Sequence, residues 1–343
     1  MAYRVIDADP DPDEVRSMTF VPFLPDGSCA VVRARTGIRL PSGEVRTGEH
    51  FLLDTSVRIP LDQAGYRMRR VHPVARDGGH LFVWLDGDRF PGRRPYGRVA
   101  LVAGEPEVLA DRLAESGRRV EARAVRDAVV SFSGRCTDDW FADSVRLLEP
   151  GYLRATTPEG GSGFAGSARR WRARRENVLA GVTGPGSFLD LGCANGLLME
   201  SVHAWAAERG VALEPYGVDL APGLVALARR RLPHWSDRIE LGNAVSWRPV
   251  DGRRFRYVHL LLDLVPDELR GALVRHASTL LEPGGRLLVS HYLNEGSSDE
   301  PVVRKLAELG VRSEGVDPDG QTAWLDARAA SRATTSVENV KSY

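Results

Sequence analysis

Residues 187–200 read SFLDLGCANGLLME and combine a strand end, a tight turn and a helix start in one short window. The apolar run ends at Asp190, and the small or polar residues 192–196 follow. The apolar residues 197–199 then begin a helical pattern. Glycine tolerates positive φ and lets backbone approach a ligand closely, and a helix start offers unpaired N–H groups. The window therefore predicts a strand–turn–helix site for a polar or anionic ligand.

Further strand patterns follow this window at the spacing of an α/β domain. A second strand over 216–218 ends in Asp219, an acid placed to accept both ribose hydroxyls of a nucleoside. The third expected strand ends near Asn243, where an adenine edge would lie. Apolar runs at 255–262 and 287–290 predict the fourth and fifth strands. Helical patterns separate these strands, at 197–208, 223–231 and 266–281.

This order of elements resembles the class I S-adenosylmethionine (SAM)-dependent methyltransferases over roughly the C-terminal half of the chain. The DLGCANG turn, the YGVDLAP acid and the LEPGG turn carry the resemblance. A nicotinamide-binding Rossmann domain is the nearest competitor, but it usually has GxGxxG, whereas the glycines here are spaced GxxxG after an acid. The resemblance implies an α/β fold, a Rossmann-like seven-stranded sheet with helices on both faces. Two closing strands, 311–316 and 322–325, would complete it.

The same resemblance implies SAM as the cofactor and assigns its contacts by position. The turn residues would lie under the methionine moiety, Asp190 would bond the amino group directly or through water, and Asp219 would hold the ribose. Leu220 would flank the adenine, and two residues would contact its edge. The expected cofactor contacts are Asp190, Gly192, Ala194, Gly196, Asp219, Leu220, Asn243, Ala244 and Leu260.

Polar side chains at the ends of the fourth and fifth strands are candidates for the methyl-acceptor side. His259 and His291 are candidate general bases, since the ordinary pKa of histidine is near neutral. Asp263 and Tyr292 are candidate substrate contacts. Methyl transfer from a sulfonium requires no metal, so none is expected.

The N-terminal part contains a second motif-like stretch, IRLPSGEVRTGE at 38–49. It resembles a Nudix hydrolase domain through Gly43 and Glu49, and Arg58 takes the arginine place of that family's signature. The family's metal-binding glutamate places hold Ile59, Asp62 and Gln63, with Pro60 inside the expected helix. Because Mg²⁺ needs several converging carboxylates, we expect a non-hydrolytic, α+β Nudix-like domain that aids substrate recognition or dimer contacts.

Composition narrows the function further. The 343 residues carry no net charge, which implies no general attraction to nucleic acid or anionic membrane. Three scattered cysteines and the lack of a signal peptide or a membrane-spanning run predict a cytoplasmic protein. The expected organisation is a flexible start (1–16), a Nudix-like domain (17–135), a connector with lid helices and a Gly/Ser-rich loop (136–186), a SAM-binding core (187–328) and a flexible tail (329–343).

Missing motifs point to a small-molecule acceptor with an O or N atom. The fourth strand lacks an Asn/Asp-Pro-Pro-aromatic sequence, and no cysteine follows it, which argues against methylation of nucleic-acid bases. Two alternatives stay open: a bifunctional Nudix hydrolase and methyltransferase, and a non-catalytic SAM-binding regulatory protein. The sequence also leaves open whether the chain forms a homodimer.

Overall fold

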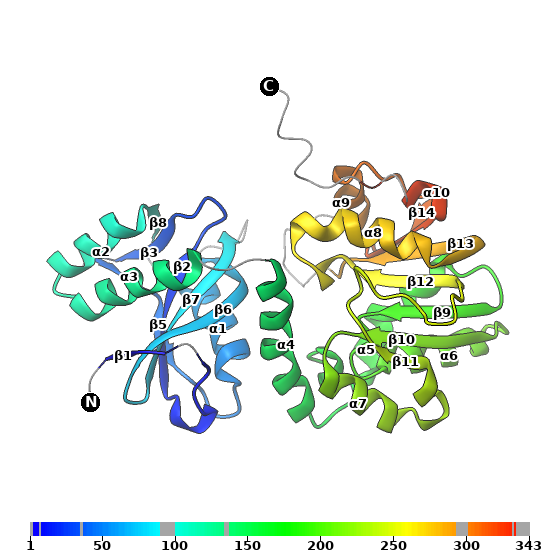
Figure 1. The fold of residues 1–343 in the computed structure, drawn as a ribbon, viewed down its shortest axis with the longest axis horizontal. Coiled ribbons are helices and arrows are strands. Elements are labelled where there is room, and N and C mark those ends of the chain that lie inside the picture. The colour runs from blue at the N-terminus through cyan, green and yellow to red at the C-terminus, as the bar shows by residue number, and fades with distance from the viewer. Residues whose placement is uncertain are drawn as a thin grey trace. The chain divides into compact units, whose positions relative to one another are not determined.

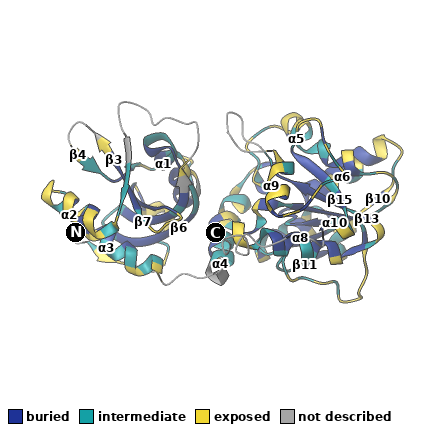
Figure 2. Cartoon of the chain, turned by 90° about the horizontal axis from the view of Figure 1, so that it is seen from above, coloured by how far each residue is buried: buried dark blue, intermediate teal, exposed yellow. Residues whose placement is uncertain are grey.

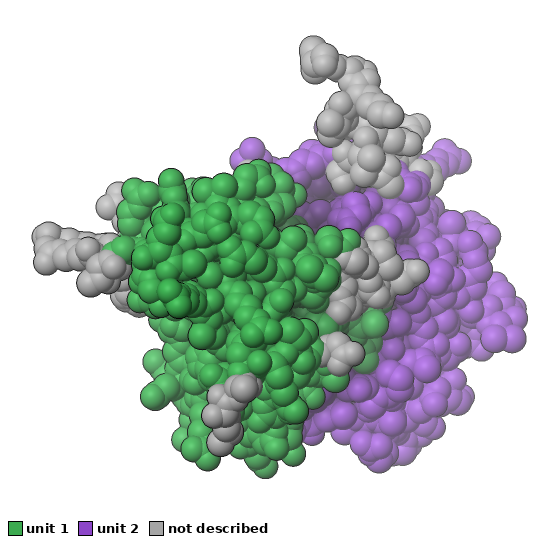
Figure 3. Space-filling model, turned by 60° about the vertical axis from the view of Figure 1, so that its left-hand side comes forward, with its two compact units in different colours: residues 1–148 green, residues 149–343 purple. Residues whose placement is uncertain are grey.

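A computed structural model of the chain describes residues 3–6, 8–34, 37–89, 100–133, 137–292, 301–330 and 333. The chain forms two compact units, Met1–Leu148 and Glu149–Tyr343 (Figure 3). Each unit has its own β-sheet (Figure 1). The boundary between the units falls inside the predicted connector, 136–186, and the finer division of the chain stays a prediction.

The first unit contains an eight-stranded mixed sheet. Its main order is β1-β6-β7-β2-β3-β4, with β5 pairing to β2 and β8 to β3. β2 and β7 run parallel, and the other pairs that the structure describes are antiparallel. The strands are β1 (Arg4–Val5), β2 (Ser17–Phe23), β3 (Cys29–Ala34), β4 (Gly37–Arg39), β5 (Ser42–Glu44), β6 (Tyr66–Asp77), β7 (His80–Arg89) and β8 (Ala100–Gly104).

Both faces of this sheet are covered, which explains the almost continuous apolar run of β2. Met18 and Phe20 belong to one apolar cluster together with Ile59 of helix α1 (Ser56–Ala64). Val21 and Phe23 point to the opposite face and belong to a second cluster, which includes residues of α2 (Pro106–Glu115) and α3 (Arg119–Ser133). Successive strand residues alternate between faces, so a strand buried on both faces needs no polar alternation. Figure 2 shows β6 and β7 of this sheet mostly in the colour of buried residues.

Two features of the first unit differ from the sequence expectation. Apolar residues recur near helical spacing across 105–130, a pattern that predicts one long amphipathic helix. The structure has two helices there, because Gly117 adopts φ +80° after α2 and ends it. The start of the chain, expected to be flexible, contributes β1, in which Arg4 and Val5 pair with Arg76 and Ala75 of β6. Backbone pairing with a sheet edge is thus available to a segment whose composition alone suggests disorder.

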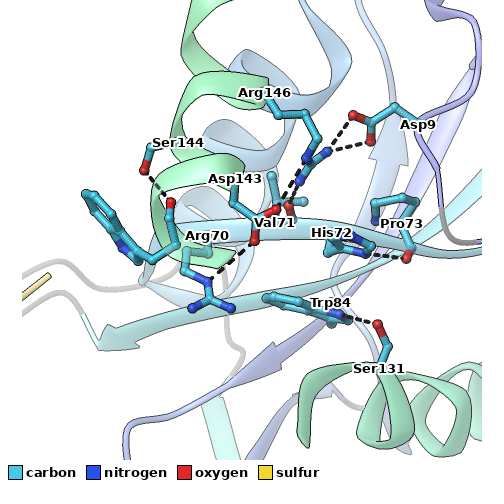
Figure 4. A network of polar contacts seen from close by, with 11 residues as sticks. Asp9, Arg70, Val71, His72, Pro73, Trp84, Ser131, Asp143, Ser144 and Arg146 are labelled. Atoms are coloured by element: carbon cyan, nitrogen blue, oxygen red, sulfur yellow. Dashed lines mark hydrogen bonds and ion pairs between the residues drawn. The ribbon is translucent and has the colours of Figure 1, made fainter. Parts of the chain in front are cut away.

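An ion-pair network joins the first half of helix α4 (Thr137–Arg154) to β6 (Figure 4). Arg146 donates to both carboxylate oxygens of Asp9, at 2.5 and 2.6 Å, and to the carbonyl of Val71. Asp143 lies 3.8 Å from the buried guanidinium of Arg70. Asp86 of β7 lies 4.0 Å from Arg70 as well, so each arginine of this network has an acidic neighbour within the first unit.

The second unit contains a seven-stranded sheet of order β11-β10-β9-β12-β13-β15-β14. The first five strands of this order are parallel, and β15 runs antiparallel to both of its neighbours. This is the Rossmann-like sheet that the sequence predicts. The strands are β9 (Gly186–Leu191), β10 (Leu213–Asp219), β11 (Ile239–Leu241), β12 (Phe255–Leu261), β13 (Leu281–Ser290), β14 (Gly315–Val316) and β15 (Thr322–Asp326).

Helices connect these strands and cover the sheet (Figure 1). The helix after the quoted window, α6, spans Leu197–Glu208, as its sequence pattern predicts. The remaining helices are α5 (Ala168–Arg175), α7 (Pro222–Arg231), α8 (Arg270–Thr279), α9 (Val302–Glu308) and α10 (Ala327–Ala330). Most of the predicted tail, 329–343, lies outside the described residues. Among the helices that the structure describes, none has the length and apolarity needed to cross a bilayer.

Candidate active site at the ends of the parallel strands

The glycine turn, residues 192–196, connects β9 to α6. Gly192 and Gly196 have φ +82° and +78°, and Ala194 has φ +47°, which is uncommon for a residue with a side chain. The amides of Gly192 and Cys193 both donate to the carbonyl of Val218 in β10, at 2.7 and 3.0 Å. These bonds hold the turn at the carboxyl ends of β9 and β10, the edge at which open α/β sheets bind ligands.

Asp219, the last residue of β10, turns its carboxylate toward the glycine turn. Its Oδ2 accepts the amide of Ala194 at 2.7 Å, and its Oδ1 accepts the amide of Ala221 at 2.9 Å. Burial raises the pKa of Asp219 above its ordinary value, although these two backbone bonds favour the ionised form. Each carboxylate oxygen can accept more than one hydrogen bond. Asp219 is therefore positioned as an acceptor for ligand hydroxyls beside the turn.

Asp190, at the end of β9, belongs to a buried chain of hydrogen bonds. Its Oδ1 lies 2.7 Å from Nδ1 of His259, whose Nε2 lies 3.0 Å from Oγ of Ser290. Oγ of Ser290 lies 2.8 Å from Oγ1 of Thr322. An ionised carboxylate only accepts, so Nδ1 of His259 donates to Asp190. The chain crosses four neighbouring strands and fixes the Asp190 carboxylate.

This chain changes the role expected for His259. Its side chain is 1% exposed and both of its ring nitrogens are engaged. A general base must reach the proton that it removes, and His259 presents no free nitrogen to a ligand. His259 therefore differs from its expected role as a catalytic base, and its geometry is that of a residue that positions Asp190.

The Gly/Ser-rich loop expected as a lid packs against the glycine turn. Asn195 donates from Nδ2 to the carbonyl of Pro158 at 2.7 Å, while its Oδ1 accepts the amide of Leu197 at 3.1 Å. Gly161 lies so close to Asn195 that an added Cβ would stand 2.7 Å from Nδ2. Asn195 is not among the site residues expected from the sequence, although it belongs to the strand–turn–helix stretch at 187–200.

The residues expected near the adenine occupy varied positions. Leu220, Asn243 and Ala244 are partly buried. Asn243 uses its Oδ1 to accept the amide of Val245 at 3.1 Å. Its side-chain N–H groups donate to no other described residue and so are available to a ligand. Leu260 is fully buried in β12 between β9 and β13. Its side chain is a core residue with no surface for a cofactor, which differs from the expectation.

Asp263 and His291 form a pair beyond the ends of β12 and β13. Nδ1 of His291 lies 3.4 Å from Oδ1 of Asp263. Nε2 of His291 is buried and has no hydrogen-bond partner among the described residues. The side chain of Asp263 is 60% exposed, and the surrounding protein opposes its ionisation only in part, so the hydrogen bond and charge of His291 hold the pKa of Asp263 below its ordinary value. An acid that orients one nitrogen of a histidine and leaves the other free is a common arrangement for a general base.

Aromatic and cationic residues complete this side of the site. The hydroxyl of Tyr292 is buried and has no partner among the described residues. The guanidinium of Arg175 stacks on the Tyr292 ring at 3.4 Å from its centroid. Burial raises the pKa of Tyr152 to about 12, and its electrostatic neighbours include both Asp219 and Asp263. Arg175 and Tyr152 are not among the site residues expected from the sequence. Arg175 is one of five arginines in the run ARRWRARR, and the pattern does not distinguish it from the others.

The described residues offer no site for a metal ion. No group of three or more His, Cys, Asp or Glu side chains among them converges in a way that would hold one. The arrangement therefore has hydrogen-bond acceptors for a nucleoside, a candidate base and a cationic residue, all at the carboxyl edge of one sheet.

A comparison with protein families supports this interpretation of the second unit. Residues 188–285 match the family model described as a methyltransferase domain. The C-terminal part of the chain therefore contains a methyltransferase domain, and the expected cofactor, SAM, agrees with this match. No curated protein matches the chain.

Solved methyltransferase structures also resemble parts of the chain. The glycopeptide N-methyltransferase MtfA is 24% identical over 38% of this chain and 56% of its own, with a TM-score of 0.30. DesVI from Streptomyces venezuelae is 26% identical over 37% and 49%, with a TM-score of 0.26. A SAM-dependent methyltransferase from Geobacter sulfurreducens, in complex with S-adenosyl-L-homocysteine, is 18% identical over 47% and 60%, with a TM-score of 0.30. This chain covers about half to three fifths of the length of these proteins.

Proposed function

We propose that this protein is a SAM-dependent methyltransferase that acts on a small molecule through an O or N acceptor atom. The observation that carries the proposal is Asp219 beside the glycine turn, within the region that matches a methyltransferase domain. A carboxylate at a strand tip, bonded to the amide of Ala194 and with acceptor capacity left, suits the paired hydroxyls of a ribose. Asp190, held by His259, would receive the amino group of the cofactor.

SAM supplies a methyl group on a sulfonium, which an acceptor lone pair displaces in line. The chain's own task is to bind both partners at short distance and to exclude water, since positioning supplies much of the rate. The loop held by Asn195 and the side chain of Tyr152 would cover the cofactor during the transfer.

We assign His291 as the general base for an acceptor hydroxyl or protonated amine. Nε2 of His291 would take the proton of a hydroxyl as the new bond to the methyl group forms, or the proton of an ammonium before the attack, which frees the nitrogen lone pair. Asp263 would stabilise the resulting imidazolium. This assignment keeps one of the two histidines that the sequence indicates and gives the other a positioning role.

We further propose that the first unit is a Nudix-like domain without hydrolase activity, used for substrate recognition or dimer contacts. Glu49 accepts two hydrogen bonds from Arg58, at 2.5 and 2.7 Å, and one from Thr55, at 2.8 Å. The hydrogen bonds from Arg58 lower the pKa of Glu49 to about 2. A carboxylate committed to these partners fixes the loop before α1 and is a poor metal ligand.

The test of the proposed function uses the full-length protein and S-adenosylhomocysteine (SAH). Calorimetry should detect SAH binding by the wild type, and Asp219→Ala should weaken it by at least about tenfold, or ~1.4 kcal/mol. Asp237→Ala, an exposed acid in the same unit, is the matched control and should bind SAH normally. Wild-type protein that is folded but does not bind SAH would refute the proposal.

Turnover then separates the enzyme from the open alternatives. Production of SAH from SAM with an acceptor supports a methyltransferase, whereas binding without turnover across acceptor classes favours a non-catalytic SAM-binding regulator. Phosphate release from nucleoside diphosphate derivatives by the same protein would favour the bifunctional alternative.

A further inference from the structure

Arg175, the last residue of α5, carries a charge for which the described part of the chain supplies no carboxylate partner. Its guanidinium carbon lies 3.4 Å from the ring centroid of Tyr292, 5.1 Å from that of Phe164 and 5.2 Å from that of Trp171. Within the described ranges its guanidinium donates one hydrogen bond, a long one of 3.4 Å to the carbonyl of Arg174. Among the described residues, no carboxylate lies within 4.0 Å of Arg175. The guanidinium is thus partly buried in an aromatic setting with most of its N–H donors unused.

The contrast with a neighbouring arginine shows that this is specific to Arg175. Arg172, on the same helix, donates to both Glu176 and Glu208 at distances from 2.5 to 3.1 Å. Arg172 is also the more exposed of the two arginines, and an ion pair at an exposed position contributes little to stability. Leaving a buried cation without an anion is costly, so the unpaired arginine is the one that burial should penalise.

The acid nearest to this region is already engaged. Asp263 attracts Arg175 electrostatically but pairs with His291, at 3.4 Å. Burial accordingly lowers the pKa of Arg175 from its ordinary value, yet a guanidinium stays protonated at neutral pH. The described residues therefore leave Arg175 without a carboxylate of its own, which makes its guanidinium a suitable partner for an anionic ligand.

A second donor stands beside Arg175. Burial raises the pKa of Tyr292 to about 12, so its hydroxyl keeps its proton. That hydroxyl is buried and makes no hydrogen bond of normal geometry among the described residues, although the nearby Ser290 hydroxyl opposes the rise in the pKa of Tyr292 and is itself engaged with His259 and Thr322. Tyr292 follows β13 directly, next to His291. A planar guanidinium and a neighbouring hydroxyl donor match the two oxygens of a carboxylate.

We propose that Arg175 and the Tyr292 hydroxyl bind a carboxylate of the methyl acceptor, so that the substrates are small anionic molecules. The proposal rests on the proposed function, because it deepens the same site. The acceptor is favoured over the cofactor's own carboxylate by position. Tyr292 directly follows His291, which we assign as the general base and which must reach the acceptor, so the pair of donors lies on the acceptor side of the site.

The test compares matched probes on the full-length SAH complex. The acceptor probes are 4-hydroxybenzoate with 4-hydroxybenzamide, and 3-aminobenzoate with 3-aminobenzamide, each titrated by calorimetry. The cofactor probes are SAH and 5′-methylthioadenosine, which lacks the amino-acid carboxylate. The variants are Arg175→Gln, Arg175→Lys and the control Arg169→Gln, an exposed arginine on the same helix. Retained SAH binding shows that each variant is folded.

We expect the wild type to prefer the carboxylate member of a pair by about tenfold or more, which equals ~1.4 kcal/mol. Arg175→Gln should abolish this preference, Arg175→Lys should keep part of it, and Arg169→Gln should keep all of it. SAH affinity should change less than about twofold in each variant.

Two results would overturn the proposal. If Arg175→Gln weakens SAH but not 5′-methylthioadenosine, the anion is the cofactor's carboxylate and the acceptor assignment is wrong. If the wild-type SAH complex shows no preference for either carboxylate probe, or Arg175→Gln keeps that preference, Arg175 does not bind an anion there. A wild type that fails to bind SAH at all refutes the proposed function instead, so the two failures are distinguishable.

Discussion

At the scale of single residues, the carboxylate of Asp219 has to meet two opposing requirements, burial and ligand binding. It stands at the tip of an apolar strand, is largely buried, and accepts two backbone amides while facing the glycine turn. Burial raises its pKa and so favours the neutral acid, whereas ligand hydroxyls need the carboxylate as acceptor. Binding and protonation therefore compete for the same oxygens.

This competition predicts a pH dependence of SAH affinity. The pKa of Asp219 in the folded protein is above its ordinary value of 3.8, so the acceptor is lost as pH falls through that raised value. SAH should bind with constant affinity at neutral pH and more weakly under mildly acidic conditions. Asp219→Asn should bind weakly with a flatter profile, as measured by calorimetry from neutral to mildly acid pH. Parallel profiles for the two proteins would contradict the assignment.

A second residue, Gly217, sets the distance between β10 and the helix after the glycine turn. An added Cβ at Gly217 would stand 2.5 Å from Sδ of Met199 and 2.8 Å from Sγ of Cys193. Gly217→Ala should lower the free energy of unfolding by about 1–3 kcal/mol through overpacking, and it should weaken SAH binding because Cys193 belongs to the turn. Urea denaturation and SAH titration measure both effects. Gly184→Ala, with open space around the added Cβ, is the control and should be neutral; equal losses in both variants would contradict the packing argument.

Some of these residues were predictable from sequence and some were not. Asp219 follows from its spacing after the glycine turn. Burial of His259 did not follow, because strands of a parallel sheet are covered on both faces and carry no alternation that tells inside from edge. Arg175 was hidden in a run of arginines, most of which have surface roles, and only the three rings around it distinguish it.

At the scale of elements, the strand order and the helix after the turn followed from apolar periodicity, since each expected strand is short and clearly bounded. The division of 105–130 into α2 and α3 did not follow. Its pattern continues across Gly117, and only the positive φ of that glycine shows the break. The sequence pattern also did not predict the series of hydrogen-bonded side chains that links β9, β12, β13 and β15.

That chain predicts a specific defect on replacing His259. His259→Leu would leave the buried Asp190 carboxylate without its donor, at a cost to stability of about 1–3 kcal/mol. If Asp190 receives the α-amino group of the cofactor, the variant should lose SAH affinity but keep its affinity for 5′-methylthioadenosine, which lacks the amino-acid part. His259→Asn retains an N–H donor and should recover part of the SAH affinity. Calorimetry with both ligands measures this, and equal weakening of both would indicate a merely structural role.

At the scale of the whole molecule, the open question is what the first unit adds to the second. Its loop and helix carry the Gly43, Glu49 and Arg58 places of a Nudix-like motif, and Glu49 and Arg58 do meet, at 2.5 Å. The places expected for metal-binding glutamates differ. Ile59 is buried 2.8 Å from where a Cβ on Gly43 would stand, and the side-chain oxygen of Gln63 accepts a hydrogen bond from Arg39 at 2.7 Å.

These contacts predict that the full-length protein does not hydrolyse diphosphates. Mg²⁺ requires several oxygen ligands, usually with more than one carboxylate, and Glu49 is committed to Arg58 and Thr55. Incubation with Mg²⁺ or Mn²⁺ and a panel of nucleoside diphosphate derivatives should release no phosphate above the metal-only background. Asp62→Ala should leave this result unchanged. Release at enzyme-like rates that Asp62→Ala abolishes would show that one carboxylate and unrecognised ligands suffice, and the first unit would then be a second enzyme.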